Sequence, residues 1–388
     1  MTRSAGPEPA RSAYGILRAL ATLLLAPLPA AGQLPASLSD TSFAQLSARL
    51  SEPSGFFDTD NLISNEDSYL HAVSTLQQLG IHGGTYLGVG PDQNFSYIAA
   101  VRPEIAFIVD IRRDNLLEQL LYQAIFRLSH DRLEFLCLLF GKAAPTPPPD
   151  HPEAWANKDV AQLLDYIDRS AWDSSAALSR VSGQVGKLGM QLSAADRTTI
   201  AGFHRTFITR GPALRMTTFN RPERLDYPDY RKLILETDLA GHRANYLASE
   251  SGFAAIKDLE DRNLVVPVVG NFAGPKALAL IGEYVRAHRS VVSVFYTSNV
   301  EQYLVQQGTM SRFRRNVERL PRGPRSVMVR SYFPYGRGHP QLVAGYLTVQ
   351  LVQEVDKFLA TGADSAEYQS YYDLVTRDLV QPATVKER

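Results

Sequence analysis

Short apolar runs alternate with helically spaced apolar residues along most of the chain. Residues 83–90 read as a buried strand that runs into a glycine turn, and residues 105–110 as a second strand that ends in an acid. Residues 94–101 between them suit a helix, and spacings of three and four predict earlier helices at 42–50 and 65–79. A single crossover helix between two strands predicts a parallel pair, so this region is one βαβ unit.

The C-terminal half repeats this alternation of strand and helix. The expected strands are a weak one at 244–248 and clearer ones at 264–269, 291–296 and 326–330. The expected helices are at 252–259, 275–287, 300–317 and, closing the chain, 346–359. Strands that alternate with helices predict an α/β fold with a doubly wound, mostly parallel sheet covered on both faces.

The middle of the chain lacks repeated strand patterns. A helical pair is expected at 116–127 and 131–140, with Ser129 as the N-cap of the second helix. Five prolines between residues 143 and 152 indicate a linker. We therefore expect residues 33–388 to form one Rossmann-like domain in which residues 143–240 are a linker plus a helical insertion.

Residues 1–32 contain, in the usual succession, the basic, apolar and small-residue regions of a secretory signal peptide. Three arginines precede an apolar run at 19–28, and small residues before Gly32 suit cleavage. The run is too short for a spanning helix. We expect an exported protein, periplasmic or extracellular, with no integral membrane domain after leader removal; an uncleaved anchor and a disordered leader are the alternatives.

Composition narrows the ligand class. Lys plus Arg and Asp plus Glu both number 40, which removes the electrostatic reason to expect nucleic acid and leaves a small-molecule ligand as the expectation. Cys137 is the single cysteine and lies in an apolar stretch, so a buried, unreactive thiol is expected. The histidines are isolated and show no metal-ligand spacing, so no metal is expected; they include His204, His242, His288 and His339.

The candidate ligand site follows the first two predicted strands. In doubly wound sheets, ligands bind beyond the carboxyl ends of the strands. The candidate cofactor-binding residues there are Gly88, Gly90, Asp92, Gln93, Asn94 and Asp110. The two glycines permit a tight turn close to a ligand, and Asp110 has the spacing of a carboxylate that accepts hydrogen bonds from a ribose. The alternative is a structural turn followed by a helix-capping aspartate.

Two departures from known fingerprints bear on the ligand. Gln93 stands at the third glycine position of the dinucleotide fingerprint. Tyr86 and Asp92 stand where methyltransferases usually have an acid and a third glycine. Asp92 would repel a pyrophosphate, whereas a carboxylate accommodates the sulfonium and ammonium of S-adenosylmethionine (SAM). The comparison favours SAM over NAD.

Polar residues after later strands are candidates for substrate binding. They are Asn271, Ser298, Asn299 and Gln302. Asn271 follows what is counted here as the fourth strand, where methyltransferases often place groups that face the substrate. Helix capping is the alternative role for Ser298 and Asn299.

Several motifs together resemble an uncharacterised bacterial family with a Rossmann-like, class I SAM-methyltransferase-type fold. They are SNEDSYL at 64–70, GTYLGVGPDQNF at 84–95, RP at 102–103, VDIRR at 109–113, NFAGP at 271–275 and YTSNVEQYL at 296–304. The resemblance covers roughly residues 40–360. It implies the fold but brings no established reaction, catalytic residue or protein partner with it.

Three functions are therefore compatible with the sequence. The first is a SAM-dependent methyltransferase of unknown acceptor, with Gly88, Gly90 and Asp92 bordering the methionine part, Asp110 holding the ribose and Asn271 orienting the acceptor. Against it stands export, since SAM is made and kept in the cytoplasm. The second is an exported, non-catalytic or repurposed protein that binds a nucleoside-like or small polar ligand. The third is a structural or interaction protein whose motifs are caps and turns.

Overall fold

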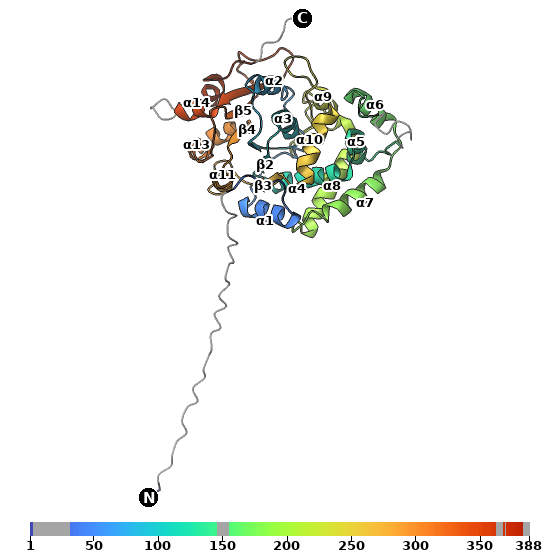
Figure 1. The fold of residues 1–388 in the computed structure, drawn as a ribbon, viewed down its shortest axis with the longest axis horizontal. Coiled ribbons are helices and arrows are strands. Elements are labelled where there is room, and N and C mark those ends of the chain that lie inside the picture. Colours follow the sequence, from blue (N-terminus) through green and yellow to red (C-terminus); the bar gives the residue numbers. More distant parts are fainter. Residues whose placement is uncertain (3–31, 146–154, 362–367, 369, 383–388) are drawn as a thin grey trace.

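The computed structural model describes residues 1–2, 32–145, 155–361, 368 and 370–382. Residues 3–31 of the expected leader and residues 146–152 of the proline-rich linker lie outside the described residues. The described part is α/β, with a six-stranded sheet in the order β3-β2-β1-β4-β5-β6 (Figure 1). The strands are β1 (Thr85–Gly88), β2 (Ile105–Asp110), β3 (Val265–Val269), β4 (Val292–Ser298), β5 (Val327–Tyr332) and β6 (Val349–Glu354). All neighbours run parallel except β5 and β6, which confirms a mostly parallel, Rossmann-like sheet.

The predicted βαβ unit forms the centre of this sheet. Strand β1 pairs in parallel with β2 on one side and β4 on the other, and α3 (Gln93–Val101) makes the crossover from β1 to β2. Every residue of β2 is buried, as its continuous apolar run requires. Helix α3 ends at Val101, and its C-cap residue Arg102 has a φ of 51° just before Pro103. Pro267 lies in β3, an edge strand, where the missing N–H leaves no ladder bond unmade.

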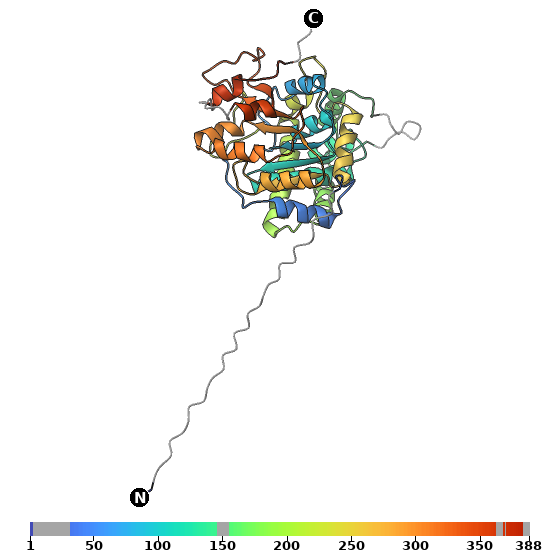
Figure 2. The same ribbon diagram turned by 60° about the vertical axis from the view of Figure 1, so that its left-hand side comes forward.

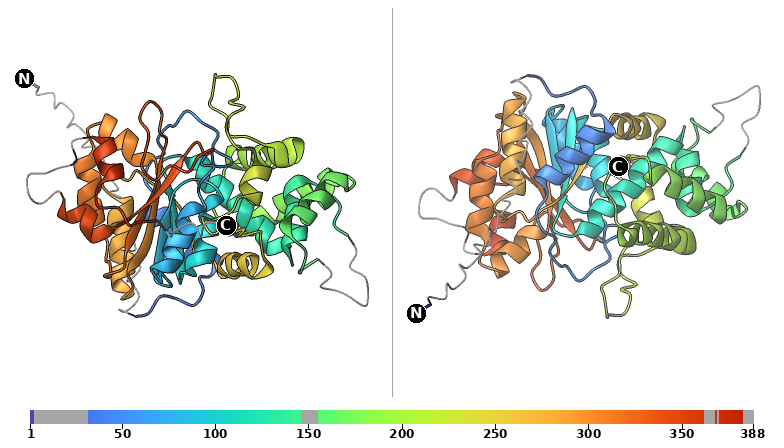
Figure 3. Two further views of the ribbon diagram at one scale, coloured as in Figure 1. Left: turned by 90° about the horizontal axis from the view of Figure 1, so that it is seen from above. Right: turned by 90° about the horizontal axis from the view of Figure 1, so that it is seen from below.

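Helices cover both faces of the sheet. Helix α10 packs against both α3 and α4 on one face, and α11 and α13 pack together on the other (Figures 2 and 3). Outside the insertion the helices are α1 (Asp40–Leu50), α2 (His71–Gln78), α4 (Arg113–Leu128), α10 (Glu250–Asp261), α11 (Ala277–Ala287), α12 (Val300–Gln306), α13 (Met310–Glu318), α14 (Val355–Ala360) and α15 (Tyr371–Thr376). No helix among the described residues is long and apolar enough to cross a membrane.

A group of helices between β2 and β3 lies beside the sheet, shown in green in Figure 3. Its members are α5 (Arg132–Phe140), α6 (Val160–Arg169), α7 (Ser174–Val185), α8 (Ala194–Arg210), a short 3₁₀ turn (Gly211–Ala213) and α9 (Tyr230–Leu235). Helix α4 joins this group to the sheet because it packs against α7 and α8 as well as β3.

Three expected elements differ in the structure. Residues 244–248 form no strand; there the Asn245 side chain accepts a hydrogen bond from the backbone N–H of Leu247, a local bond that competes with a ladder. The expected closing helix at 346–359 is instead β6 followed by α14, because its first half pairs antiparallel with β5. The expected helix at 300–317 is two helices, interrupted at Gly308, which has a φ of 65°.

One expected helix start and one expected N-cap are also wrong. Residues 65–67 precede the second helix rather than forming its acidic first turn, since α2 begins at His71. The N-cap of α5 is Asp131, whose side chain accepts from the N–H of Glu134. Ser129 instead donates to the carbonyl of Ile125 at the end of α4.

Candidate functional site

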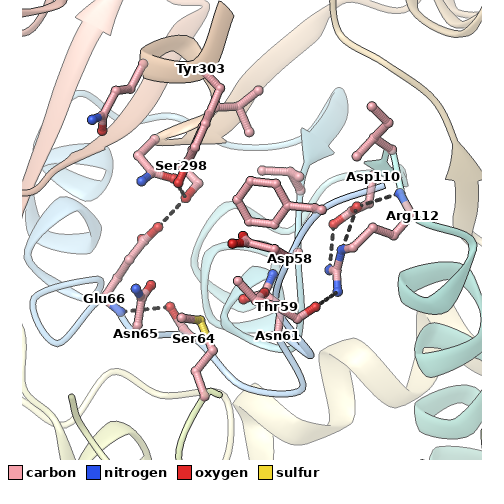
Figure 4. A pocket seen from close by; sticks show the side chains of 18 of the residues that line it. Asp58, Thr59, Asn61, Ser64, Asn65, Glu66, Asp110, Arg112, Ser298 and Tyr303 are labelled. Carbon is pink, nitrogen blue, oxygen red and sulfur yellow. Dashed lines mark hydrogen bonds and ion pairs between the residues drawn. The ribbon is translucent and has the colours of Figure 1, made fainter. Parts of the chain in front are cut away.

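A pocket of about 310 Å³ lies at the carboxyl ends of β1 to β4 (Figure 4). Each of these strands contributes residues at its carboxyl end or shortly after it. They are Gly90 and Gln93 after β1, Asp110, Ile111 and Arg112 after β2, Asn271 and Phe272 after β3, and Ser298, Asn299, Gln302 and Tyr303 at and after β4. The predicted meeting of Gly90, Asp110, Asn271 and Asn299 at one sheet edge is therefore observed.

A segment between α1 and α2, residues 52–61, crosses this edge and forms another wall. Its backbone donates from Glu52 to the carbonyl of Val269 and from Gly55 to the carbonyl of Ile111, both at 2.8 Å, which ties it to the ends of β3 and β2. Phe57 from this segment meets Tyr303 of α12 edge to face, with ring centroids 5.0 Å apart. Aromatic rings from separate elements thus enclose the space above the strands.

Asp110 is held by an ion pair. Its Oδ1 accepts from the backbone N–H and the Nε of Arg112, and its Oδ2 accepts from Nη2 of Arg112 at 3.0 Å. The same guanidinium donates from Nη1 to the carbonyl of Asp60 at 2.9 Å. Burial opposes the charge on Arg112, but the adjacent Asp110 outweighs it and leaves the pKa of Arg112 above its ordinary value. The pair fixes both side chains at the pocket wall.

Glu66 is a second carboxylate at the pocket, on the opposite side from Asp110 in Figure 4. Its Oε2 accepts from the hydroxyl of Tyr296 at 2.6 Å and from Nε2 of Gln350 at 3.0 Å, and its Oε1 accepts from the hydroxyl of Ser298. Only 2% of Glu66 is exposed. All three donors are neutral.

Ser298 reaches Glu66 from a strained backbone conformation. Its φ is 52°, in the left-handed region that non-glycine residues seldom adopt. Such conformations persist where surrounding contacts hold them, and they are found preferentially at ligand sites. The expected helix-capping bond is absent here, since the N-cap residue Asn299 makes no side-chain capping bond to α12.

The inner half of the glycine turn does not line the pocket. An added Cβ on Gly88 would lie 1.9 Å from Oδ1 of Asn94 and 2.7 Å from the Tyr86 ring. Asn94 is fully buried, and its Nδ2 donates to carbonyls of the turn, including Pro91 at 2.7 Å. Residues 88 and 94 therefore fill the space over the strand end with protein.

The side chain of Asp92 also points into the protein interior and away from the pocket. Its Oδ2 accepts from the hydroxyls of Tyr230 and Tyr246, which come from the insertion and from the loop before α10. Burial raises the pKa of Asp92 to about 6, although the two tyrosine hydrogen bonds act in the opposite direction. Of the expected cofactor residues, Gly90, Gln93 and Asp110 line the pocket, whereas Gly88, Asp92 and Asn94 do not.

The strands that precede the candidate substrate-binding residues are numbered differently from what the sequence predicted. Because residues 244–248 form no strand, β3 precedes Asn271, and the residues that end and follow the fourth strand are Ser298 and Asn299. Asn271 lines the pocket, but its Oδ1 accepts from the N–H of Ala273 within its own turn. The carboxylate of Glu52 accepts hydrogen bonds from the backbone N–H groups of Lys276 and Ala277 at the start of α11.

Glu66, Arg112 and Phe57 are pocket residues that the sequence reasoning did not identify. Glu66 lay within a quoted motif but was interpreted as part of a helical first turn. A buried carboxylate before a strand carries no distinguishing sequence signal, because the partners of Glu66 are separated from it by more than 200 positions.

The remaining reactive side chains lie apart from the pocket. The described residues include no group of three or more His, Cys, Asp or Glu side chains suited to a metal ion. Cys137 is buried, and burial raises the pKa of its thiol to about 12, as expected of an unreactive cysteine. Buried His204 contacts the carbonyl of Leu138 and buried His339 that of Val375.

Comparison with known proteins gives a family without an activity. A search of curated proteins finds no match. One family model, described as a domain of unknown function (DUF7790), matches residues 62–385. This range holds the whole sheet and the strand-end residues of the pocket. The chain therefore belongs to the DUF7790 family.

Proposed function

We propose that the chain binds SAM, or a closely related nucleoside ligand, in the pocket at the carboxyl edge of its sheet and that it is a methyltransferase-like protein acting on a small molecule. The observation that carries this is the meeting of three groups in one pocket: the outer half of the glycine turn at Gly90, the acid that ends β2, and polar residues at the end of β4. These groups suit a nucleoside at one end and an acceptor at the other.

The strand order supports the proposal. The order 3-2-1-4-5 is that of a Rossmann-like sheet, and the antiparallel sixth strand beside the fifth departs from the dinucleotide-binding Rossmann sheet, whose strands are mostly parallel. Fold by itself does not establish function, because one fold hosts many activities. The pocket residues must carry the rest.

Asp110 retains room for a ribose hydroxyl. A carboxylate offers about four acceptor positions, and the bonds from Arg112 use three of them. The remaining position belongs to Oδ2. Gly90, with a φ of 84°, keeps the turn free of a side chain beside the pocket. When bound, SAM would supply an electrophilic methyl group, and the protein's part would be to align an acceptor with it.

A second candidate is the repurposed, non-catalytic binder. It is favoured by the inward half of the turn, where Asn94 occupies the space over Gly88 and the tyrosines engage Asp92. Gly88 and Asp92 were expected to border the methionine part of SAM. The export expected from residues 1–32 would favour the same candidate, because an exported enzyme would lack its cosubstrate.

Thermal unfolding of the full chain with SAM, S-adenosylhomocysteine, adenosine and NAD separates the two candidates. A ligand at about 100 times its dissociation constant adds roughly 2.7 kcal/mol of stability. We expect stabilisation by SAM and S-adenosylhomocysteine and none by NAD. Stabilisation by adenosine without SAM would favour the repurposed binder. No shift with any nucleoside would refute both.

A further inference from the structure

We propose that Glu66 binds a protonated nitrogen of the acceptor, so that the second ligand of this pocket is a small amine with an apolar or aromatic body. This inference rests on the proposed function, since it names the acceptor class for the same pocket. It concerns the β4 side, whereas Asp110 serves the β2 side, and β1 lies between the two.

The charges around the pocket leave Glu66 uncompensated. Five charged side chains line it, and four of them form pairs: Asp110 with Arg112 at 3.0 Å and Asp58 with Arg221 at 2.9 Å. Glu66 has no ion pair with any described residue. Buried charges in proteins are normally paired. A ligand with one positive charge would complete this pocket.

The hydrogen bonds of Glu66 leave an acceptor position for that ligand. Tyr296 and Gln350 donate to Oε2, while Ser298 alone donates to Oε1. An ionised carboxylate is an acceptor only, and each oxygen accepts about two bonds. Oε1 therefore retains one position, which a donor from the pocket can fill. An ammonium group provides both the hydrogen and the charge.

Neutral donors also fix where the carboxylate lies. The hydroxyl of Tyr296 accepts from Nε2 of Gln93 at 3.2 Å while it donates to Glu66, so the start of α3, strand β4 and the loop before α2 are joined at this point. Ser298 contributes from its left-handed conformation at the end of β4. This network orients Glu66 without neutralising it.

Aromatic side chains in the pocket would contact the apolar body of the proposed amine ligand. Phe57 and Tyr303 meet edge to face, and Phe333 stacks on Tyr335 with ring centroids 5.7 Å apart. All four rings line the pocket, and Tyr335 is 57% exposed, so its ring extends the apolar surface outward. Rings and a carboxylate in one pocket match an arylalkylamine.

The test compares two ligands that differ in one group. Tyramine carries an ammonium at neutral pH, and tyrosol carries a hydroxyl in its place. Titration calorimetry of the full chain with each, in the presence of S-adenosylhomocysteine, should show tyramine binding about tenfold or more tightly, the effect of a charge-assisted bond. This ratio is measured on the unaltered protein. Equal affinities, or binding of neither compound, would overturn the inference.

Two variants locate the charge. Glu66→Gln should reduce tyramine binding to the level of tyrosol, and circular dichroism would verify its folding. Asp58→Asn is the matched control, because Asp58 lines the same pocket but is already paired and partly exposed, so we expect less than about a threefold change. If Glu66→Gln does not fold, Glu66→Asp should lower the tyramine to tyrosol ratio by withdrawing the charge. An unchanged ratio in a folded Glu66 variant would overturn the inference.

Binding of S-adenosylhomocysteine separates this inference from the proposed function. Affinity for S-adenosylhomocysteine that is unaffected by Glu66→Gln, together with selectivity for tyramine, supports both. Selective tyramine binding without S-adenosylhomocysteine binding contradicts the proposed function and leaves an amine site at Glu66. Loss of S-adenosylhomocysteine affinity in Glu66→Gln with no tyramine selectivity would assign Glu66 to the ammonium of the nucleoside ligand and overturn the acceptor class.

Discussion

Asp92 and Asp110 belong to one βαβ unit, yet they lie in opposite environments. Asp110 lines the pocket and is paired with a guanidinium, whereas Asp92 is buried among tyrosine hydroxyls with its pKa raised to about 6. The first forms an ion pair with Arg112 at 3.0 Å. The second is accommodated best when protonated.

The same division applies to the two glycines of the turn. Gly88 is needed because Asn94 and Tyr86 fill the space beside it, and Gly90 is needed because its φ is 84°. A glycine-rich turn after a strand therefore need not face a ligand along its whole length. Motif spacing locates such a turn, but packing decides which of its residues are available.

The largest expected effect is that of Asp110→Ala on stability. It would leave the buried Arg112 without its carboxylate, and breaking a buried pair costs about 3–5 kcal/mol. This differs from the expectation for a carboxylate that only accepts bonds from a ligand, whose loss would leave folding largely intact. Chemical denaturation measures the free energy of unfolding.

The double variant Asp110→Asn/Arg112→Leu removes both charges and serves as its control. It should recover most of the lost stability while still weakening nucleoside binding by about 1.5–3 kcal/mol, the range for hydrogen bonds to a charged group. Unchanged nucleoside affinity in a stable double variant would remove Asp110 from the ligand site.

The next largest effect is expected for Gly88→Ala. The new methyl group would overlap Oδ1 of Asn94, and overpacking at a fully buried contact should cost about 3 kcal/mol. Gly90→Ala is the matched control on the outer side, where the nearest atom is Nε2 at the end of the Gln93 side chain, 3.2 Å away. Its left-handed conformation should cost about 1–2 kcal/mol. Equal losses in the two variants would contradict the inward and outward division of the turn.

The smallest of these effects is expected for Asp92→Asn, and it depends on pH. The folded pKa of about 6 exceeds the ordinary aspartate value of 3.8, so the unfolded state releases its proton first and stability falls as pH rises from about 4 to 6. Asparagine cannot ionise. The variant should therefore be more stable than the unaltered protein by about 2 kcal/mol at pH 8 and no more stable at pH 4. Denaturation at both pH values measures this, and a difference independent of pH would show that Asp92 is not destabilised by its charge.

Much of the fold was predictable because its strands are buried on both faces. Residues 105–110 and 265–269 are short apolar runs, and the helices between strands have clear spacing. The wrong secondary-structure predictions occurred where the spacing of apolar residues fits both a strand and a helix. The residues of β6 alternate too little to distinguish a strand from a helix, and the antiparallel partner that decides the outcome is β5, which is separated from β6 by a long loop.

The site was predictable only in the residues that directly follow strands. Gly90, Asp110 and Ser298 reach the pocket because strand polarity places them there. Sequence spacing could not show that Asp92 turns inward, since that depends on Tyr230 and Tyr246, which are supplied by distant segments. For the same reason it could not show the role of Glu66.

The crossing segment at residues 52–61 has a practical consequence for any shortened form of the protein. The family match begins at residue 62, so it omits Phe57 and the backbone that ties α1 to β2 and β3. It also omits Glu52, whose carboxylate occupies the amide groups at the start of α11. A chain trimmed to the matched boundary would lack one wall of the pocket at the carboxyl ends of the strands. Domain boundaries taken from the family match would therefore remove part of this pocket, and expression of this protein should begin upstream of α1.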